Sequence, residues 1–465
     1  MDGVAFLVVV ASVWYLVGYS RSKEDTSNIP WAPDKLLIIG HALAYRKDPA
    51  GFMLRACQKV GGIFQLNLAG KHMFIVADTE AQKLVSKAPE RILSARQAVA
   101  DIGFNETLGK LNVYQGTDIH KGIVKAVWQK DPKEHVEGWV ESLRSSMELE
   151  TGGGSHFELF QLIRRVVLRA SIDRMVSPEF LNGFSDFLDD FMSFQDCLED
   201  VTAKAVILPR WIALPGLLMP VQRRREKLQT KIAKRLDELL ATSSPRIGFW
   251  LVELYPKHSI KDIAEYIVGL LFAAHKNPAI GASQMYVMLF ENCSSIEQQE
   301  IRSDATKLLS DLDTRWNDKS TLLHKLCLET LRLTAHSIGS VRTAKEPFEV
   351  QLGGQSYIFP VGASIGLTHI TLSLQPALWG ETAARLDLKA HALEKYQDEY
   401  QFSTFSNGLH RCPGQQLAVV ILQLTVALLL VEYEVVLPPH LPPLSFERPT
   451  LAQREGPVHV QVLKK

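Results

Sequence analysis

Apolar residues recur every three or four positions along much of the chain between about Ala81 and Leu333, as in "HVEGWVESLRSSMELE" and "VQRRREKLQTKIAKRLDELLA". This spacing places the apolar side chains on one face of a helix. Shorter strand-like segments occur near the start, in "GGIFQLNLAGKHMFIVA", and later, in "PFEVQLGGQSYIFPVG" and "GPVHVQVLKK". These segments predict small hairpins. The pattern therefore predicts a mainly α fold with small β-sheets.

The chain begins with an almost unbroken apolar run from Gly3 to Tyr19, which is near the lower length limit for spanning a bilayer. Asp2 precedes the run and Arg21 and Lys23 follow it, whereas a cleavable signal peptide normally starts with basic residues. A buried helix is the alternative. We interpret residues 1–20 as an N-terminal transmembrane anchor that leaves the rest of the protein in the cytosol.

Prolines stiffen the segment that follows, because proline fixes φ and restricts the residue before it. Pro30 and Pro33 therefore predict a hinge over residues 21–45. The turn "TGGGS" near residue 151 is too short to mark a domain boundary. We expect residues 46–465 to form one catalytic domain.

Composition excludes some classes of function. The chain has 465 residues, of which 46% are hydrophobic and 22% charged, so it is long and apolar enough for a sizeable core. Its 51 basic residues balance its 51 acidic residues, and nothing suggests nucleic acid as a partner. The odd number of cysteines and the lack of C-x-x-C spacing argue against a disulfide framework or a zinc site. These cysteines are Cys57, Cys197, Cys293, Cys327 and Cys412.

One cysteine lies in a segment suited to binding a cofactor, "FSNGLHRCPGQQLAVVILQLTVALLL". Cys412 lies between Gly408 and Gly414, immediately before an apolar helix. A helix N-terminus favours a thiolate, so we expect the pKa of Cys412 to be lowered and its sulfur to be a good ligand. The glycines would permit a flat cofactor to approach the backbone, and Phe405 could pack beside it. A buried free cysteine in a loop is the alternative.

The four positions Phe405, Gly408, Cys412 and Gly414 match F-x-x-G-x-x-x-C-x-G, so the segment resembles the signature of the cytochrome P450 family. The resemblance implies a single haem-thiolate domain with the cytochrome P450 fold, in which Cys412 is the metal ligand of haem b. The sequence "HRC" at His410 resembles the sterol 14-demethylase branch. By this resemblance, His410 would donate a hydrogen bond to a haem propionate.

A second motif precedes the cysteine by about 80 residues. In "HKLCLETLRLTAHSIGSVR", Glu329 and Arg332 are three residues apart and lie on one helix face. A surface ion pair with this spacing is common and contributes little. In this position it resembles the E-x-x-R pair of the family, which is buried behind the haem. Arg342 resembles a further propionate partner, although both His410 and Arg342 could instead be solvated surface residues.

The chain departs from the family pattern W-x-x-x-R, because Pro132 stands where Trp128 predicts an arginine that binds a propionate. Lys121, His120 or Lys125 could donate to a carboxylate instead. We select Lys121 as the candidate.

A second departure lies in the segment "ARLDLKAHAL", which stands where the family has P-E-R-F. The arginine that would complete the Glu329 and Arg332 group is therefore missing. His391 or Lys389 could replace it.

The segment "SIKDIAEYIVGLLFAAHKNPAIGASQMYVMLFEN" resembles the long helix that crosses above the haem. Ser259 is a plausible N-cap with Asp262 three residues on, and the helix could continue to about Asn292. Pro278 lacks an N–H and cannot bond the carbonyl of Ala274, so it should open that turn. The freed carbonyl would then be a place for water or substrate to bind.

In the family this helix carries A/G-G-x-D/E-T, whose acid and threonine deliver protons, whereas this chain has Lys276 and Asn277 at those positions. An ammonium only donates hydrogen bonds, and an amide does not titrate in the useful range. Proton delivery would then depend on water held by Asn277 or on His275, whose ordinary pKa lies near neutrality. His275, Lys276 and Asn277 are the candidate catalytic residues.

The resemblance implies a monooxygenase that uses O2 and NADPH-derived electrons from NADPH-cytochrome P450 reductase. Its expected substrate is a lipophilic small molecule, such as a terpenoid, sterol or polyketide, in secondary metabolism. The expected location is the endoplasmic reticulum membrane, with a single-pass anchor. The apolar segment that starts at Val206, "VILPRWIALPGLLMPVQRRREK", could rest on the bilayer or could be a plain core loop.

Two other classes of function remain. The pair Lys276 and Asn277 is also consistent with a haem-thiolate isomerase or dehydratase that needs no external electrons. Some rearranging members of the family, prostacyclin synthase among them, have asparagine at the threonine position and a nearby proline. The other class is a non-catalytic haem-binding protein.

Overall fold

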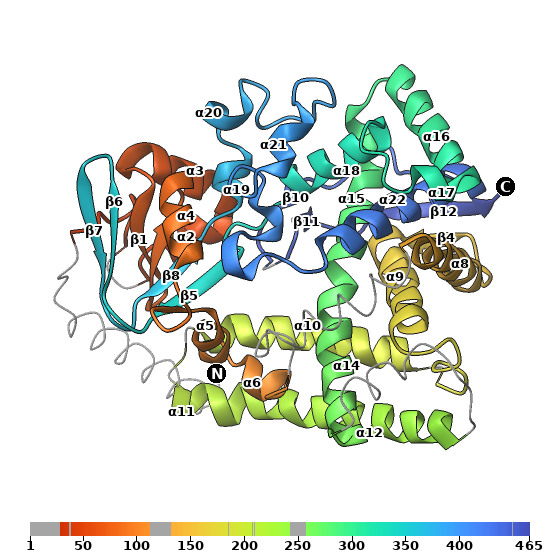
Figure 1. Cartoon of the computed structure of the whole chain (residues 1–465), viewed down its shortest axis with the longest axis horizontal. Helices are drawn as coiled ribbons and strands as arrows, with labels where there is room; N and C mark the ends of the chain where they lie inside the picture. Colours follow the sequence, from red (N-terminus) through yellow and green to blue (C-terminus); the bar gives the residue numbers. More distant parts are fainter. Residues whose placement is uncertain are drawn as a thin grey trace.

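The computed structural model describes residues 28–36, 39–111, 132–184, 186–206, 208, 210–241, 257–448 and 450–465. Most of these residues are helical, and the sheets are small (Figure 1). The mainly α fold with small β-sheets is confirmed. The predicted anchor at residues 1–20 and the first part of the predicted hinge lie outside the described residues, so both stay predictions.

The long helices carry the core, and several short ones connect them. The helices are α2 (Ala42–Lys47), α3 (Pro49–Val60), α4 (Thr79–Lys87), α5 (Ala95–Asp101), α6 (Phe104–Thr107), α8 (Pro132–Thr151), α9 (Leu159–Met175), α10 (Phe187–Ala205), α11 (Arg210–Ala213), the π-helical turn η1 (Leu214–Leu218), α12 (Met219–Ala241), α14 (Ile260–Ala274), α15 (Lys276–Asn292), α16 (Ser295–Ser310), α17 (Leu312–Arg315), α18 (Leu322–Leu333), α19 (Ile370–Ser373), α20 (Pro376–Trp379), α21 (Leu393–Gln397) and α22 (Gln415–Glu432).

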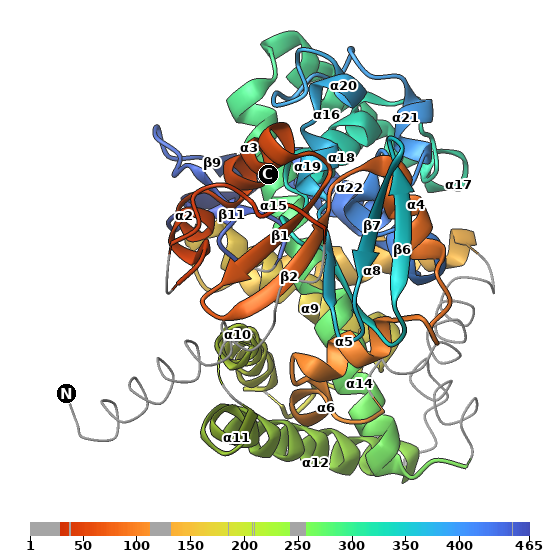
Figure 2. The same ribbon diagram turned by 90° about the vertical axis from the view of Figure 1, so that its left-hand side faces the viewer.

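The strands form one five-stranded sheet and three smaller sheets. They are β1 (Ile63–Leu68), β2 (Lys71–Val76), β3 (Leu93–Ser94), β4 (His156–Glu158), β5 (Ser340–Ala344), β6 (Phe348–Leu352), β7 (Gln355–Phe359), β8 (Ser364–Leu367), β9 (Tyr433–Val436), β10 (Leu444–Ser445), β11 (Gln453–Arg454) and β12 (His459–Lys464). The large sheet has the order β1-β2-β8-β5-β3, and the others are β4-β12-β9, β6-β7 and β10-β11. The sheet that contains β5 and β8 lies at one side of the molecule (Figure 1), and in the view onto that side the β6–β7 hairpin lies beside β1 and β2 (Figure 2).

Two of the three predicted hairpins are confirmed. β1 and β2 pair antiparallel with Ile63 opposite Val76, and β6 pairs with β7 in the same manner. The C-terminal segment is different, because β12 pairs with β4 and β9 rather than with an adjacent strand. The sequence shows that a strand is present there, but its partners are distant along the chain.

The helices α14 and α15 run through the middle of the molecule, from α12 at one end to α18 at the other (Figure 1). Ser259 caps α14 with a capping box to Asp262, and α15 ends at Asn292, as the sequence predicts. The two helices are separated at His275, whose φ of −114° departs from the ordinary helical value of about −63°, although its ψ of −43° stays helical. The turn that Pro278 was predicted to open is therefore interrupted.

The helix α22 follows the cysteine loop and packs against α15. At this contact an added Cβ on Gly281 would lie 2.8 Å from a methyl carbon of Leu422, so the two helices approach closely. Among the described residues, α22 is the helix long and apolar enough to cross a membrane, but most of it is buried in the core. Its apolar character is explained by this packing.

Candidate active site

The cysteine loop is held in shape by its own backbone. The N–H of Cys412 donates to the carbonyl of Phe405 over 2.8 Å, which closes the loop. Gly408 has φ +65°, and an added Cβ there would lie 2.6 Å from the carbonyl oxygen of Ser86. A side chain would be strained at this position for both reasons. By contrast, Gly414 has open space where a side chain would point.

Cys412 is exposed to solvent, although enough protein atoms lie near its thiol to desolvate it. Burial raises the pKa of the Cys412 thiol above its ordinary value, while the N–H of Gly414 and the charge of Arg411 lower it only in part. The predicted lowering by the helix N-terminus is therefore wrong for the free thiol, because desolvation outweighs the local dipole. A bound metal would still favour the thiolate, since it competes directly with the proton.

Beside this loop, Arg342 of β5 is buried, with only 3% of its surface exposed. Its Nη1 donates to the carbonyl of Val341, but its Nη2 is buried without a hydrogen-bond partner. Burial lowers the pKa of Arg342 to about 10, and the charge of Glu90 opposes the shift. A buried guanidinium with an unused donor is costly unless an anion binds there.

His410 lies close to the same charges. Its Nε2 is 3.3 Å from a carboxylate oxygen of Glu90, and its side chain is 24% exposed. Burial lowers the pKa of His410, and the charge of Arg342 adds to this effect. Neither His410 nor Arg342 is a fully solvated surface residue. The unused Nη2 of Arg342, the accessible thiol and the tight glycine loop fit the haem that the resemblance implies.

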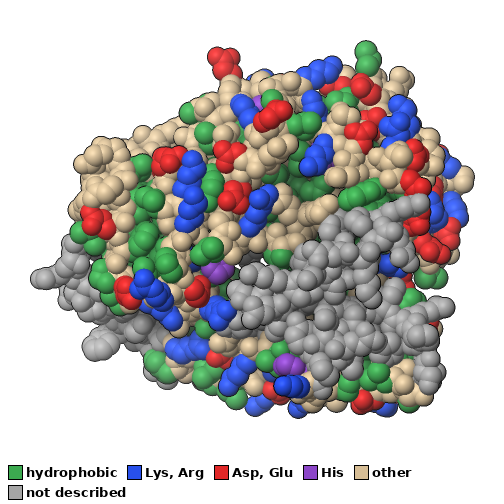
Figure 3. All heavy atoms as spheres, in the orientation of Figure 1, with side chains coloured by type: hydrophobic (Ala, Val, Ile, Leu, Met, Phe, Trp, Pro, Cys, Tyr) green, Lys and Arg blue, Asp and Glu red, His purple; other side chains and the backbone are tan. Residues whose placement is uncertain are grey.

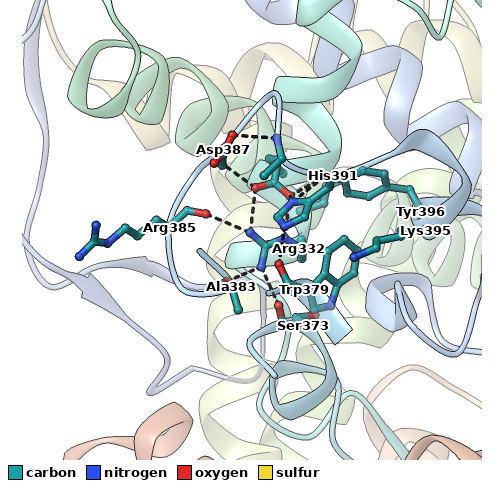
Figure 4. Close-up of polar contacts among 12 residues, drawn as sticks. Arg332, Ser373, Trp379, Ala383, Arg385, Asp387, His391, Lys395 and Tyr396 are labelled. Atoms are coloured by element: carbon teal, nitrogen blue, oxygen red, sulfur yellow. Dashed lines mark hydrogen bonds and ion pairs between the residues drawn. The ribbon is translucent and has the colours of Figure 1, made fainter. Parts of the chain in front are cut away.

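Glu329 and Arg332 of α18 form an ion pair whose two side chains have no exposed surface. Arg332 donates from Nε and Nη2 to the two carboxylate oxygens over 2.6 and 2.8 Å. Its other hydrogen bonds reach carbonyls in the segment that runs from the last residue of α19 to beyond α20, as the dashed lines in Figure 4 show. These carbonyls belong to Ser373, Ala383 and Arg385. The pair therefore ties α18 to this segment.

Two side chains complete the carboxylate group in place of the missing arginine. Tyr396 of α21 donates its hydroxyl to Glu329 Oε1 over 2.5 Å, and His391 places Nδ1 3.3 Å from the same oxygen. Of the two predicted candidates, His391 makes this contact. Sequence reasoning missed Tyr396, because no local spacing relates it to a glutamate 67 residues away.

The electrostatics of this group follow from its contacts. Burial alone would raise the pKa of Glu329, but the hydrogen bonds from Arg332 and His391 and the charge of Arg332 lower it to about 2. Burial, together with the Glu329 charge, raises the pKa of Tyr396. The glutamate therefore stays ionised, and the tyrosine stays a donor, throughout the physiological range.

The interruption between α14 and α15 leaves carbonyl groups that side chains satisfy. His275 Nδ1 donates to the carbonyl of Leu271 over 2.7 Å, and Gln195 Nε2 donates to the carbonyl of Phe272 over 3.2 Å. A helix end needs such donors, because its last carbonyls have no partner within the helix. Ala273 is exposed at this point, although most of α14 is buried. Ala273 is therefore the exposed residue of the last turn of α14.

The pKa of His275 differs from the ordinary value on which its predicted role depends. The side chain is fully buried, and its ring lies 5.7 Å from the ring of Phe191 in α10. Burial lowers the pKa of His275 to about 3, and the charge of Arg164 adds to the effect. A histidine that stays neutral near pH 7 cannot serve there as a proton donor of ordinary pKa.

Lys276 and Asn277 point to different partners. The ammonium of Lys276 is 2.7 Å from Asp196 and also contacts Glu199, both in α10. Asn277 accepts a hydrogen bond from the N–H of Leu451 over 3.2 Å, so its amide N–H groups remain to donate. Lys276 is thus committed to α10, and Asn277 lies beside the segment between β10 and β11.

The apolar segment after Val206 forms α11 and η1, and part of it is exposed. Trp211 has 69% of its surface exposed, while Leu218 is buried. Arg210 binds Glu106, which joins this segment to α6. The interpretation as a plain core loop is therefore wrong for Trp211.

The other predicted cofactor residue, Lys121, lies outside the described residues, together with Trp128. Its role stays a prediction.

Among the described residues, no group of three or more His, Cys, Asp or Glu side chains could hold a metal ion. On the face drawn in Figure 3, acidic and basic side chains of the described residues are interspersed.

Comparisons with known proteins agree with this geometry. The family model described as Cytochrome P450 matches residues 30–462. Probable lanosterol 14-alpha demethylase from Acanthamoeba polyphaga mimivirus is 20% identical over 453 residues, which cover 91% of this chain and 61% of the viral protein. The chain therefore spans less than two thirds of that relative's length.

Two fungal relatives are covered more completely. Cytochrome P450 monooxygenase pynD from Aspergillus niger is 21% identical over 471 residues, which cover 95% of this chain and 93% of the relative. Cytochrome P450 monooxygenase pyvB from Aspergillus violaceofuscus is 24% identical over 452 residues, which cover 92% and 88%.

Proposed function

The chain belongs to the cytochrome P450 family and is a monooxygenase of that family, and from this premise we propose that it oxidises a lipophilic small molecule in secondary metabolism. The proposed cofactor is haem b, with electrons from NADPH passed by NADPH-cytochrome P450 reductase. The two fungal relatives support the monooxygenase class, and the predominantly apolar nature of ligand pockets supports the lipophilic substrate.

The observation that carries the proposal is the accessible Cys412 at the end of a backbone-closed loop. Haem held by a thiolate supplies the chemistry of oxygen activation when it is bound. In the proposed site Cys412 is the metal ligand, and Arg342 and His410 hold the propionates. Lys121 is proposed as a further donor to them.

Other residues of the signature shape the site. Phe405 and Gly408 fix the loop, and Gly414 has open space where a side chain would point. Behind the loop, Glu329 and Arg332 keep α18 tied to the segment that leads into it. We assign these residues structural roles.

The oxygen side of the proposed site is the last turn of α14 and the first turn of α15. Ala273 is exposed, and Asn277 has amide N–H groups that can donate to water. Pro278 has no N–H for the carbonyl of Ala274, which leaves that carbonyl as a further acceptor. Lys276 acts through α10 rather than on the reacting groups.

A second candidate function is a haem-thiolate isomerase or dehydratase that uses no external electrons. It is favoured by the placement of three side chains: burial lowers the pKa of His275 to about 3, the ammonium of Lys276 is paired with Glu199, and Asn277 carries an amide in place of an acid or alcohol. A rearrangement needs fewer protons than reduction of O2 does. A non-catalytic haem-binding protein is the third candidate.

We further propose attachment to the endoplasmic reticulum membrane through residues 1–20, with the catalytic domain in the cytosol. The exposed Trp211 supports contact between the α11 segment and a bilayer, because an amphipathic ring suits the interface. Expression of the full chain and of residues 28–465, followed by membrane fractionation, tests this attachment.

The function is tested by expressing the chain with a cytochrome P450 reductase in microsomes and feeding lipophilic metabolites in 18O-labelled oxygen. NADPH-dependent appearance of label in product supports the monooxygenase. Turnover of a peroxide substrate without NADPH would support rearrangement instead. Intact haem without either reaction would support the non-catalytic protein.

A further inference from the structure

Four charged side chains join three helices beside the interruption at His275. Lys276 of α15 contacts Asp196 and Glu199 of α10, and Arg164 of α9 donates to Asp196 over 2.8 Å. We propose that Lys276 is a positioning residue, whose bridge to α10 holds the interruption open and so fixes the oxygen-side wall. The effect of this bridge on catalysis rests on the proposed function, whereas the contacts between Lys276 and α10 do not depend on it.

The charged side chains of this group are largely buried. The Lys276 side chain is 4% exposed and that of Arg164 is 6% exposed, so both cations are largely removed from water. The two carboxylates balance them, and Glu199 is itself only 16% exposed. A buried ammonium is costly without an anion. The start of α15 therefore cannot separate from α10 unless Lys276 loses its partners.

The same stretch of α10 also binds the backbone at the interruption. Gln195 precedes Asp196 in α10, and its amide donates to the carbonyl of Phe272 and, over 3.3 Å, to Glu199. In an uninterrupted helix the N–H of Lys276 would bond that carbonyl. One stretch of α10 thus supplies a donor for the freed carbonyl and anions for the lysine that follows it. These contacts stabilise the interrupted form over a straight helix.

The interruption sets the positions of the residues on either side of it. Asn277 immediately follows the lysine and is held by the N–H of Leu451, and the exposed Ala273 lies just before the break. A change in the turn at His275 would rotate these residues relative to each other. The position of α10 and the shape of the oxygen-side wall are therefore one coupled arrangement.

Hydrogen–deuterium exchange of the haem-loaded full chain tests the coupling, with peptides that cover residues 187–205 and 271–279. Lys276→Met removes the ammonium but keeps an unbranched side chain. We expect exchange in both segments to become about tenfold faster, which corresponds to 1.4 kcal/mol. Lys276→Arg, and the exchanged pair Lys276→Glu with Glu199→Lys, should restore slow exchange in both.

The matched control is Lys204→Met in α10, the helix that Lys276 contacts. Lys204 pairs with Asp200 over 2.6 Å, but the two side chains are 59% and 62% exposed. This variant should exchange like the unchanged chain. Faster exchange at 187–205 alone after Lys276→Met would overturn the proposal, and so would a failure of the exchanged pair to restore protection.

If Lys276→Met does not fold, Gln195→Met decides the same question without changing charge. Loss of its amide should speed exchange at residues 271–279, and unchanged exchange there would overturn the proposal. Exchange is measured without turnover. A chain that binds no haem through a thiolate would refute the proposed function, whereas the exchange data would still test the coupling on the folded chain.

Discussion

The carboxylate of Glu329 provides the sharpest test of how this core is held together. Replacing Tyr396 by Phe removes one hydroxyl, whose hydrogen bond to Glu329 Oε1 spans 2.5 Å. The carboxylate would keep both bonds from Arg332 and a bond from the N–H of Asp387 over 3.2 Å. A hydrogen bond to a charged group contributes about 1.5–3 kcal/mol, so Tyr396→Phe should destabilise by this amount.

Glu329→Gln should cost more, because it leaves Arg332 buried without its counter-charge. Breaking a buried ion pair typically costs about 3–5 kcal/mol. The neutral amide would also direct two N–H groups at a site lined by donors. We therefore expect Glu329→Gln to destabilise more than Tyr396→Phe, and Tyr396→Phe more than a surface control.

Urea unfolding followed by circular dichroism measures these differences in the free energy of unfolding. The control is Tyr357→Phe in β7, because the Tyr357 hydroxyl bonds Gln355 over 3.2 Å at an exposed position. Its effect should stay within about 0.5 kcal/mol. The reasoning is refuted if Tyr396→Phe is as mild as this control, or if Glu329→Gln costs less than Tyr396→Phe.

Three further predictions concern the ionisation of Glu329, the buried Arg342 and the glycines of the cysteine loop. The pKa of Glu329 falls from its ordinary 4.5 to about 2, so its contribution to stability should be complete above pH 4.5 and be lost as the pH falls toward 2. In an acid titration, the free energies of unfolding of Glu329→Gln and of the unchanged chain should converge near pH 2. A difference that stays constant with pH would contradict this. Arg342→Met should weaken haem retention about tenfold, equivalent to 1.4 kcal/mol, with Arg342→Lys intermediate, as measured by haem content after dialysis; equal retention would exclude Arg342 as a propionate partner. Gly408→Ala should destabilise the folded chain by about 1–2 kcal/mol or more, because Gly408 has a positive φ and lies against Ser86. Gly414→Ala should not destabilise it, because open space lies there. A thermal unfolding experiment that ranks the two variants in the opposite order would be inconsistent with the loop geometry.

The parts of the site that could be predicted are those with local spacing. The loop around Cys412, the pair Glu329 and Arg332, and the cap at Ser259 each depend on residues within a few positions of one another. Pro278 likewise marked the turn that is interrupted. For these features, backbone chemistry and helix periodicity were sufficient.

The rest depends on contacts between distant segments. Tyr396 reaches Glu329 across 67 positions, and Lys276 reaches Glu199 across 77, so no spacing rule could pair them. The pKa directions of Cys412 and His275 were missed for a related reason. Their local surroundings suggested ordinary or lowered values, but the dominant cause is burial, which only the packed chain reveals.

The central claim is that Cys412 binds haem iron as a thiolate. The most direct measurement is the absorption spectrum of the reduced carbon monoxide complex, recorded for the unchanged chain and for Cys412→Ser, with Cys327→Ser as a control at a buried cysteine. We expect a thiolate-type spectrum that Cys412→Ser abolishes and Cys327→Ser retains. Survival of that spectrum in Cys412→Ser would contradict the central claim.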